Sequence, residues 1–431
     1  MSNQDLKPMD LSLLERVNPI YNTAKMSLCG LAMSGDRDAA AISEKLGLPS
    51  EMFQVSASDP DSSTPNQLAA LQAQANAVFL EIRFRTTWAL AENSDCRTIV
   101  DLPCGYTPRG LQAACANRSY IGLDLPATIS EAERVIMPLV DEDKRPLIRY
   151  AAVDATNYES LEAALDGANG PICVTTEGLV MYFNDSEAAQ LCGNIRRLLS
   201  KYGGCWITSD PEMMIQNTEV MRAIAGDRFQ EVVNNSMKAF EDKADIHVEV
   251  PALVILPWKD VEADTKKALS FLSGQGLKAE RMIVGRHMPE INSLSTLKPG
   301  GAEAVKKGME TCAYWKIELA DDAKPAAEEQ SASDFTVRAT QKESRLDLCL
   351  SGRLDTLTAP VVLDLFEKTS KDSAVSNVLV DCSKLQYISS AGLRVLLIIH
   401  KACKGGVTLQ NTNEAIMDIL NQTGFAPVFH F

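Results

Sequence analysis

Seven short apolar runs alternate with segments of helical spacing before residue 320, and this alternation leaves the chain few possible folds. Such runs are typical of a parallel sheet that is covered by helices on both faces. We therefore predict an α/β fold built on a seven-stranded, doubly wound, Rossmann-like sheet. The predicted strands are residues 97–102, 119–123, 147–152, 171–176, 203–208, 279–284 and 312–319.

Additional helices are expected at two places outside this alternation. Residues 11–47 and 67–93 have helical spacing and precede the first strand, and the long stretch 211–278 contains a helical insertion. In doubly wound folds ligands bind at the carboxyl edge of the sheet, and extra helices at these two places would lie over that edge.

Four successive predicted strands are each followed by a residue suited to a ligand, namely Gly105, Asp124, Asp154 and Glu177. A glycine after the first strand permits a tight turn and a close approach of the backbone, and an acid after the second can bind ribose hydroxyls. One turn glycine is usually structural and one acidic loop residue is usually just solvated, but four such positions in succession are unlikely by chance. The fingerprint GxGxxG is absent, which argues against NAD or FAD.

These strand ends resemble class I S-adenosylmethionine-dependent methyltransferases, and among them the leucine carboxyl methyltransferase family. The resemblance covers about residues 65–320, and it is carried by residues 100–110, 120–124, 153–155 and 176–183. It implies an S-adenosyl-L-methionine site in a Rossmann-like domain. In that site Gly105 would lie against the methionine part, Asp124 on the ribose, Asp154 and Ala155 at the adenine, and Glu177 near the methionine amino group.

Arg83 resembles the arginine that holds the cofactor carboxylate in this family, although the same helix can equally present Arg85. Glu177 is expected to lie in the cleft and to matter for the cofactor rather than for folding. No substrate-binding segment of the family is recognisable before residue 65. The methyl acceptor therefore stays open: a carboxyl or a hydroxyl group, on a small molecule or a peptide.

The nature of the acceptor decides whether a base is needed. A carboxylate is already ionised near pH 7, so catalysis reduces to alignment with the methyl group. A hydroxyl acceptor needs a general base, for which His287 is the candidate. Tyr182 belongs either to the core or to the acceptor pocket, and neither His247 nor His287 lies in a triad motif.

A second α/β pattern occupies residues 335–431. It predicts a strand at 345–355 that turns at Gly352, a helix at 358–368, a strand from 379, an apolar helix after the pair Ser389 and Ser390, a strand at 407–410 and a helix at 413–421. A hydroxyl at the start of a helix either caps it or accepts a phosphate, because unpaired N–H groups and the helix dipole favour negative charge there.

Residues 352–356 and 387–393 resemble the STAS domain of bacterial anti-sigma-factor antagonists. In that family the phosphorylated serine follows an acidic residue and stands two positions before a glycine. Ser390 holds this position here, while Ser389 replaces the acidic residue. The resemblance implies phosphorylation at Ser390, with Ser389 as the alternative, and an anti-sigma-type Ser kinase as partner.

Charge distinguishes the two parts of the chain. Residues 335–431 contain 10 Lys/Arg and 9 Asp/Glu, a net charge of +1. Residues 1–334 therefore carry a net charge of −16 and are unsuited to binding nucleic acid. Residues 320–334 are small and acidic, as in a linker. The expected organisation is a helical cap (1–64), a methyltransferase domain (65–319), a linker (320–334) and a STAS domain (335–431).

Eleven cysteines occur without a CxxC pair or a Cys/His cluster, the pattern of reduced thiols in a protein without a metal site. The first twenty residues have acidic side chains and no apolar run, so no signal peptide is expected. No stretch approaches 18 apolar residues, so no membrane span is expected either. Together these features predict a cytoplasmic protein.

Two functions are compatible with these residues. One is an active O-methyltransferase whose STAS domain sends or receives a phosphorylation signal. The other is a regulator that binds S-adenosylmethionine without turnover and acts as an anti-sigma-factor antagonist. Only turnover distinguishes the two.

Overall fold

The computed structural model describes residues 20–48, 65–234, 251–320, 335–342, 344–372 and 375–431. Contacts between residues divide the chain into two compact units, each with its own sheet. The predicted linker lies outside the described residues apart from Ala320. His247 and the two ends of the predicted N-terminal cap (1–19 and 49–64) also lie outside them.

The larger unit contains the predicted seven-stranded sheet, and the fold class is confirmed. The strand order is β3-β2-β1-β4-β5-β7-β6, and β7 is antiparallel to both of its neighbours while all other pairs are parallel. The strands are β1 Thr98–Asp101, β2 Ser119–Asp124, β3 Ile148–Ala152, β4 Ile172–Thr176, β5 Gly204–Thr208, β6 Leu277–Ile283 and β7 Ala313–Leu319.

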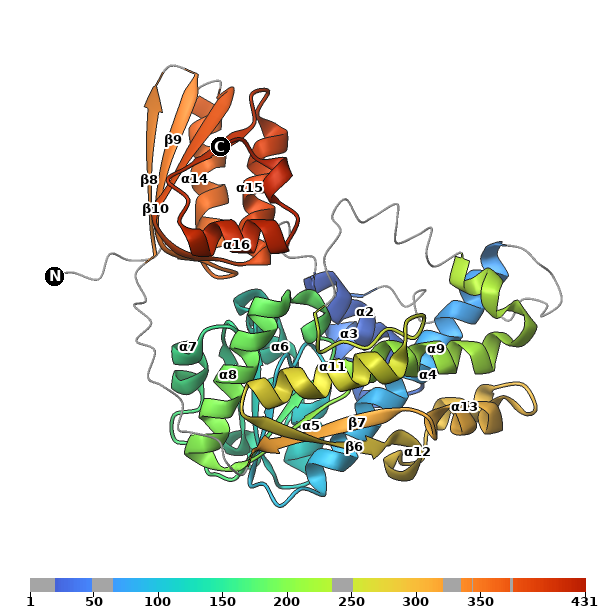
Figure 1. The fold of residues 1–431 in the computed structure, drawn as a ribbon. Helices are drawn as coiled ribbons and strands as arrows, with labels where there is room; N and C mark the ends of the chain where they lie inside the picture. The colour runs from blue at the N-terminus through green and yellow to red at the C-terminus, as the bar shows by residue number, and fades with distance from the viewer. Residues whose placement is uncertain (1–19, 49–64, 235–250, 321–334, 343, 373–374) are drawn as a thin grey trace. The chain divides into compact units, whose positions relative to one another are not determined.

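Helices cover both faces of this sheet (Figure 1). Ile99 and Val100, which are neighbours in β1, belong to two different hydrophobic cores, because successive side chains of a strand point to opposite faces. The first core includes side chains of α4 Pro65–Glu92, α5 Arg109–Cys115, α6 Pro126–Ile136 and α9 Met213–Ala225, and the second those of α7 Tyr158–Ala164, α8 Asp185–Tyr202 and α11 Val261–Gly274. Two short helices, α12 Val284–His287 and α13 Gly301–Met309, follow β6.

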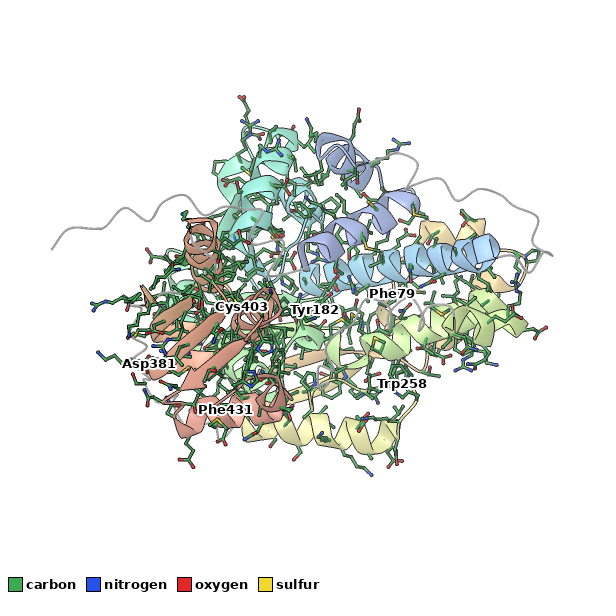
Figure 2. The ribbon with its side chains drawn as sticks, turned by 90° about the horizontal axis from the view of Figure 1, so that it is seen from above. Phe79, Tyr182, Trp258, Asp381, Cys403 and Phe431 are labelled. Carbon is green, nitrogen blue, oxygen red and sulfur yellow. The ribbon has the colours of Figure 1, made fainter. Side chains whose placement is uncertain are left out.

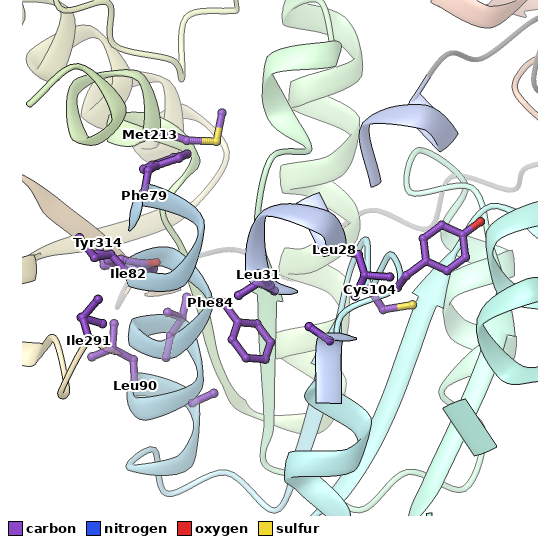
Figure 3. Packing of buried hydrophobic residues seen from close by; sticks show 14 of the residues in the cluster. Leu28, Leu31, Phe79, Ile82, Phe84, Leu90, Cys104, Met213, Ile291 and Tyr314 are labelled. Carbon is purple, nitrogen blue, oxygen red and sulfur yellow. The ribbon is translucent and has the colours of Figure 1, made fainter. Parts of the chain in front are cut away.

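Two helices precede α4, namely α2 Ile20–Met33 and α3 Arg37–Lys45. Leu28 and Leu31 of α2 are buried in the first core, which also contains Phe84 of α4 and Cys104 after β1 (Figure 3). Helix α2 is therefore anchored to the sheet unit by its apolar side chains. No helix within the described ranges is long and apolar enough to cross a membrane.

The smaller unit has a four-stranded sheet in the order β11-β10-β9-β8. Strands β9, β10 and β11 are parallel, and β8 pairs with β9 in the antiparallel direction. Its elements are β8 Thr336–Lys342, β9 Arg345–Leu354, α14 Ala359–Asp372, β10 Asn377–Ile388, α15 Ser390–Ala402, β11 Val407–Gln410 and α16 Glu414–Gln422.

Two features of this unit differ from the sequence prediction. The predicted turn at Gly352 is wrong, because β9 continues through this residue to Leu354. Gly352 has φ +89° and stands opposite Leu385, where the pairing register of β9 and β10 shifts, so the glycine permits an irregularity within a strand. Strand β8 was not predicted at all.

Candidate functional site

The candidate site lies where the strand order of the larger sheet reverses. β2 lies on one side of β1 and β4 on the other, so the connections after β1 and β4 lead in opposite directions. A crevice forms at such a point at the carboxyl ends of the strands. Gly105 is in the loop after β1, and Glu177 directly follows β4.

Gly105 and Asp124 are in direct contact. The Gly105 N–H donates to Oδ2 of Asp124 at 2.8 Å, and the Leu125 N–H donates to Oδ1 at 2.7 Å. Gly105 has φ +54°, a conformation that favours glycine. Burial raises the pKa of Asp124 to about 6, although its two backbone hydrogen bonds oppose the shift. The turn after β1 is thereby fixed to the end of β2.

Asp154 and Ala155 form the start of the loop after β3. Asp154 Oδ1 accepts hydrogen bonds from the backbone N–H and the hydroxyl of Thr156, both at 2.8 Å. The Ala155 carbonyl accepts from the side chain of Asn194 at 3.0 Å. The Val153 N–H donates to the Asp124 carbonyl at 2.9 Å, so this loop begins beside the end of β2. Three of the four strand-end positions are thus neighbours.

Glu177 is held by two arginines. Its Oε1 lies 2.7 Å from Nη2 of Arg109, and its Oε2 lies 3.2 Å from Nε of Arg83. Burial raises the pKa of Glu177, but Arg109 and Arg83 outweigh burial and hold the pKa below its usual value. The expectation that Glu177 matters only for a cofactor therefore needs correction, because the residue is part of a buried ionic network.

The centre of this network is Arg109, whose importance sequence reasoning missed. Its side chain is 1% exposed, and Nη1 lies 2.7 and 2.8 Å from the two carboxylate oxygens of Asp101. Asp101 also accepts hydrogen bonds from the hydroxyls of Tyr120 and Thr175. The sequence did contain an indication of this ion pair. Asp101 and Arg109 stand at equal distances before and after Gly105, and the residues between them are apolar or small.

The structure brings Arg83, and not Arg85, to Glu177. Nη1 of Arg83 also lies 3.1 Å from Sδ of Met213, and the guanidinium lies 5.4 Å from the ring centre of Phe79 on α4 (Figure 2). Arg85 instead pairs with the buried Glu81 at 2.7 Å. Arg85 thus belongs to a separate structural ion pair.

The two weak catalytic candidates lie in different places. Tyr182 (labelled in Figure 2) lies in the 3₁₀ turn Val180–Tyr182, and it interacts with the Thr23 hydroxyl and with the charge of Arg83. Burial raises the pKa of Tyr182. His287 follows the outer strand β6, which β5 and β7 separate from β4, and it lines a pocket with Cys96 and Cys205. His287 thus follows a strand that is not next to β4, and its role as a general base for a hydroxyl acceptor stays a prediction.

Helix α2 lies over this edge of the sheet. A Cβ atom placed on Gly105 would lie 3.7 Å from the side chain of Ala24. Lys25 pairs with Glu131 at 2.9 Å, and its ammonium lies 5.7 Å from the ring centre of Tyr106. The helix therefore packs directly against the turn that follows β1.

In the smaller unit the two serines before α15 have different environments. Ser389 is the N-cap of α15, is 4% exposed, and accepts a hydrogen bond from the Gly392 N–H at 3.3 Å. Ser390 is the first residue of the helix and is half-buried. Ser389 thus caps α15, and Ser390 is the more exposed of the two serines.

The family model described as the STAS domain matches residues 336–431. The smaller unit is therefore a STAS domain. A solved structure of an anti-sigma factor antagonist from Mycobacterium paratuberculosis is 21% identical, with a TM-score of 0.21, and the match covers 23% of this chain and 87% of that one. No curated protein matches the chain.

Solved methyltransferase structures match the larger unit. An O-methyltransferase family protein from Burkholderia thailandensis is 13% identical, with a TM-score of 0.31, and the match covers 61% of this chain and 62% of that one. Human N-acetylserotonin methyltransferase, solved with SAM, is 12% identical, with a TM-score of 0.30 and coverage of 65% and 62%. The chain thus spans about three fifths of the length of these two structures. Within the described residues no group of His, Cys, Asp or Glu is arranged to hold a metal ion.

Proposed function

We propose that the larger unit is an S-adenosylmethionine-dependent O-methyltransferase of the leucine carboxyl methyltransferase type. The observation that carries the proposal is the position of two pairs at the point where the strand order reverses. One pair is Gly105 with Asp124, and the other is Arg83 with Glu177. The Gly105–Asp124 pair could bind a ribose, because the carboxylate accepts from the hydroxyls and the glycine lets the backbone come close. The Arg83–Glu177 pair could bind the charged groups of an amino acid.

The methionine end of S-adenosylmethionine is a zwitterion, so it matches an Arg–Glu pair in charge. Its carboxylate can replace Glu177 as the partner of Arg83, and its ammonium group can replace Arg83 as the partner of Glu177. Asp124 would hold the ribose hydroxyls, and Asp154 with Ala155 would border the adenine. When bound, the cofactor supplies an electrophilic methyl group.

The acceptor that fits this site best is a carboxylate on a small molecule or peptide. His287 lies away from Glu177, and burial raises the pKa of Tyr182, so neither is suited to remove a proton near neutral pH. A carboxylate is already ionised and requires only alignment with the methyl group. Tyr182 would then border the acceptor.

For the whole chain we propose residues 1–64 as a cap, 65–319 as the methyltransferase domain and 320–334 as a linker to the STAS domain. In the STAS domain, Ser390 would be phosphorylated by an anti-sigma-type Ser kinase that binds the unmodified form. A cytoplasmic location is supported by the cysteines, all eleven of which are free.

Titration calorimetry with S-adenosylmethionine tests the cofactor site. We expect Asp124→Ala to weaken binding by about 100-fold, because a charge-assisted contact to the ribose is lost. The exposed Asp143→Ala is the matched control and should bind like the wild type. Binding by Asp124→Ala as tight as that of the wild type would remove Asp124 from the site.

Turnover separates the enzyme from its alternative, a regulator that binds the cofactor without using it. The alternative is favoured by one observation: Glu177 and Asp124 already have partners within the protein. Incubation with methyl-labelled S-adenosylmethionine and a metabolite extract should give a labelled ester that mild base hydrolyses. Binding without any labelled product would favour the regulator.

A further inference from the structure

Three cysteine thiols gather on one face of the large sheet, away from the site described above. Cys96 precedes β1, Cys173 lies in β4 and Cys205 lies in β5. Cys173 and Cys205 stand side by side in the pairing register of β4 and β5. All three are free and buried, and they belong to the same hydrophobic core.

The sulfur atoms of Cys96 and Cys205 are 4.0 Å apart. Sulfur atoms at this separation are in contact but not bonded, and a disulfide requires about 2.05 Å. Hydrogen bonds from the thiols of Cys173 and Cys205 lower the pKa of Cys96, because they favour its thiolate. A thiolate is the reactive form of cysteine.

A pocket of about 510 Å³ adjoins this pair. Both Cys96 and Cys205 line it, whereas Cys173 does not. The charged and titratable side chains around it are Asp95, His287, Lys316 and Glu318. The pocket is thus polar enough to admit water and small polar solutes, although the thiols themselves are nearly covered.

We propose that Cys96 and Cys205 are a redox-modification site that a small peroxide converts into a disulfide. The Cys96 thiolate attacks one peroxide oxygen, the O–O bond breaks, and the leaving hydroxide takes a proton to become water. The sulfur is left as a sulfenic acid. Cys205 then attacks that sulfur: the S–S bond forms, the S–O bond breaks, and the thiol proton leaves with the hydroxide as a second water.

The balance is two thiols oxidised by two electrons and one peroxide reduced to two waters. Cys96 reacts first because its thiolate is the favoured one. Cys205 resolves the intermediate because its sulfur is in contact with that of Cys96 and it also lines the pocket. The disulfide would link the segment before β1 to β5, across β4.

The test is peptide mass spectrometry of the intact chain after treatment with hydrogen peroxide. Remaining thiols are blocked with N-ethylmaleimide, and the digest is analysed without reductant. We expect a linked Cys96–Cys205 peptide that disappears on reduction. A Cys96–Cys173 link, or a free Cys96 thiol when the exposed Cys115 and Cys349 are already oxidised, would overturn the proposal.

Serine variants separate the role of Cys96, which attacks the peroxide, from the role of Cys205, which resolves the sulfenic acid. In Cys205→Ser the reaction should stop at the sulfenic acid, so dimedone should label Cys96 about tenfold more than in the wild type, where the disulfide competes. Cys96→Ser should give neither product, and the surface variant Cys115→Ser should give the same link as the wild type. A link that forms equally in Cys173→Ser would support the pair, and loss of the link there would overturn it.

Discussion

Arg109 is the residue on which the interior of the candidate site depends. It is a fully buried cation between two carboxylates, Asp101 and Glu177, and it lies over the ring of Phe84 at 5.1 Å. A buried charge is tolerated only when partners satisfy it, so the loss of either acid leaves a cation that water cannot reach.

For this reason we expect Glu177→Gln to destabilise the protein even without cofactor, by about 2 kcal/mol. The amide keeps the shape of the side chain but loses the charge that faces Arg109 and Arg83. Urea unfolding of the apo protein measures the change, and Glu142→Gln, at a side chain 89% exposed, is the control. An unchanged midpoint in Glu177→Gln would mean that Asp101 alone satisfies Arg109.

Asp124 should make cofactor binding sensitive to pH. Burial raises its pKa to about 6, while that of Glu177 is lowered, so only Asp124 of these two acids titrates in the mildly acidic range. The ionised form is the better acceptor for ribose hydroxyls. Affinity for S-adenosylmethionine should therefore be constant above pH 7 and fall about tenfold for each pH unit below 6.

Calorimetry at several pH values provides the measurement, with Asp124→Asn as the comparison. The amide cannot ionise in this range, so its binding should be weaker and largely independent of pH. If the wild type and Asp124→Asn show the same pH dependence, another group controls binding.

At the scale of elements, the start of β5 depends on Gly204. It has φ +107°, and a Cβ atom there would overlap the backbone carbonyl of Ile172 in the neighbouring β4. Backbone atoms within a paired sheet cannot move aside as a flexible side chain can. We expect Gly204→Ala to cost more than about 3 kcal/mol or to abolish folding.

Gly193→Ala is the matched control, because it lies within α8 and no atom approaches its Cβ position. Alanine in a helix should stabilise the protein by about 0.5–1 kcal/mol. Thermal unfolding of both variants tests the pair. Equal melting temperatures would show that β4 and β5 can separate at this end without cost.

Elements with buried, strongly apolar sequences were predictable, and exposed or context-dependent ones were not. All seven strands of the large sheet were predicted. Most are short apolar runs such as 172–176, whereas β6 also contains Lys278, Glu280 and Arg281 and is partly exposed. Strand β8 was missed because it is an edge strand with polar residues and half-exposed alternate positions. The antiparallel direction of β7 was not foreseen, since strand direction depends on the tertiary path of the chain.

The same limit applies to the residues of the candidate site. The strand-end positions Gly105 and Asp124 could be placed together from topology alone, because both follow neighbouring parallel strands. The sequence could not show that Arg83 rather than Arg85 pairs with Glu177, since this depends on which face of the helix meets Glu177. The burial of Arg109 likewise depends on contacts between segments distant in sequence.

For the whole molecule, the decisive experiment is a pull-down with the candidate Ser kinases of the source organism. Phosphate on Ser390 would add about −1.5 to −2 charges at the N-terminus of α15, where the helix dipole favours negative charge, so the domain should accept it without unfolding. Leu393 is fully buried, so the predicted docking face of Leu393 and Arg394 is reduced to Arg394, and the same charge should weaken the binding of a partner that docks there. We expect Ser390→Asp to retain at least about tenfold less kinase than Ser390→Ala.

Ser389→Ala is the informative control, because it removes the helix cap and should cost about 1 kcal/mol of stability without a new charge. It should therefore bind the kinase as Ser390→Ala does. Equal retention by Ser390→Asp and Ser390→Ala would make the STAS domain a passive interaction module. Mass spectrometry after co-expression would identify the modified serine.

The direction of β7 decides where the chain leaves the larger unit. Leu319, at the end of β7, pairs with Leu277 at the beginning of β6, and so stands at the margin of the sheet opposite to the turns of Gly105 and Glu177. The chain therefore leaves β7 at the edge of the sheet that does not carry the turns after β1 and β4. Gene fusion after β7 can therefore add, exchange or remove a module without altering any residue of the turns that form the candidate site.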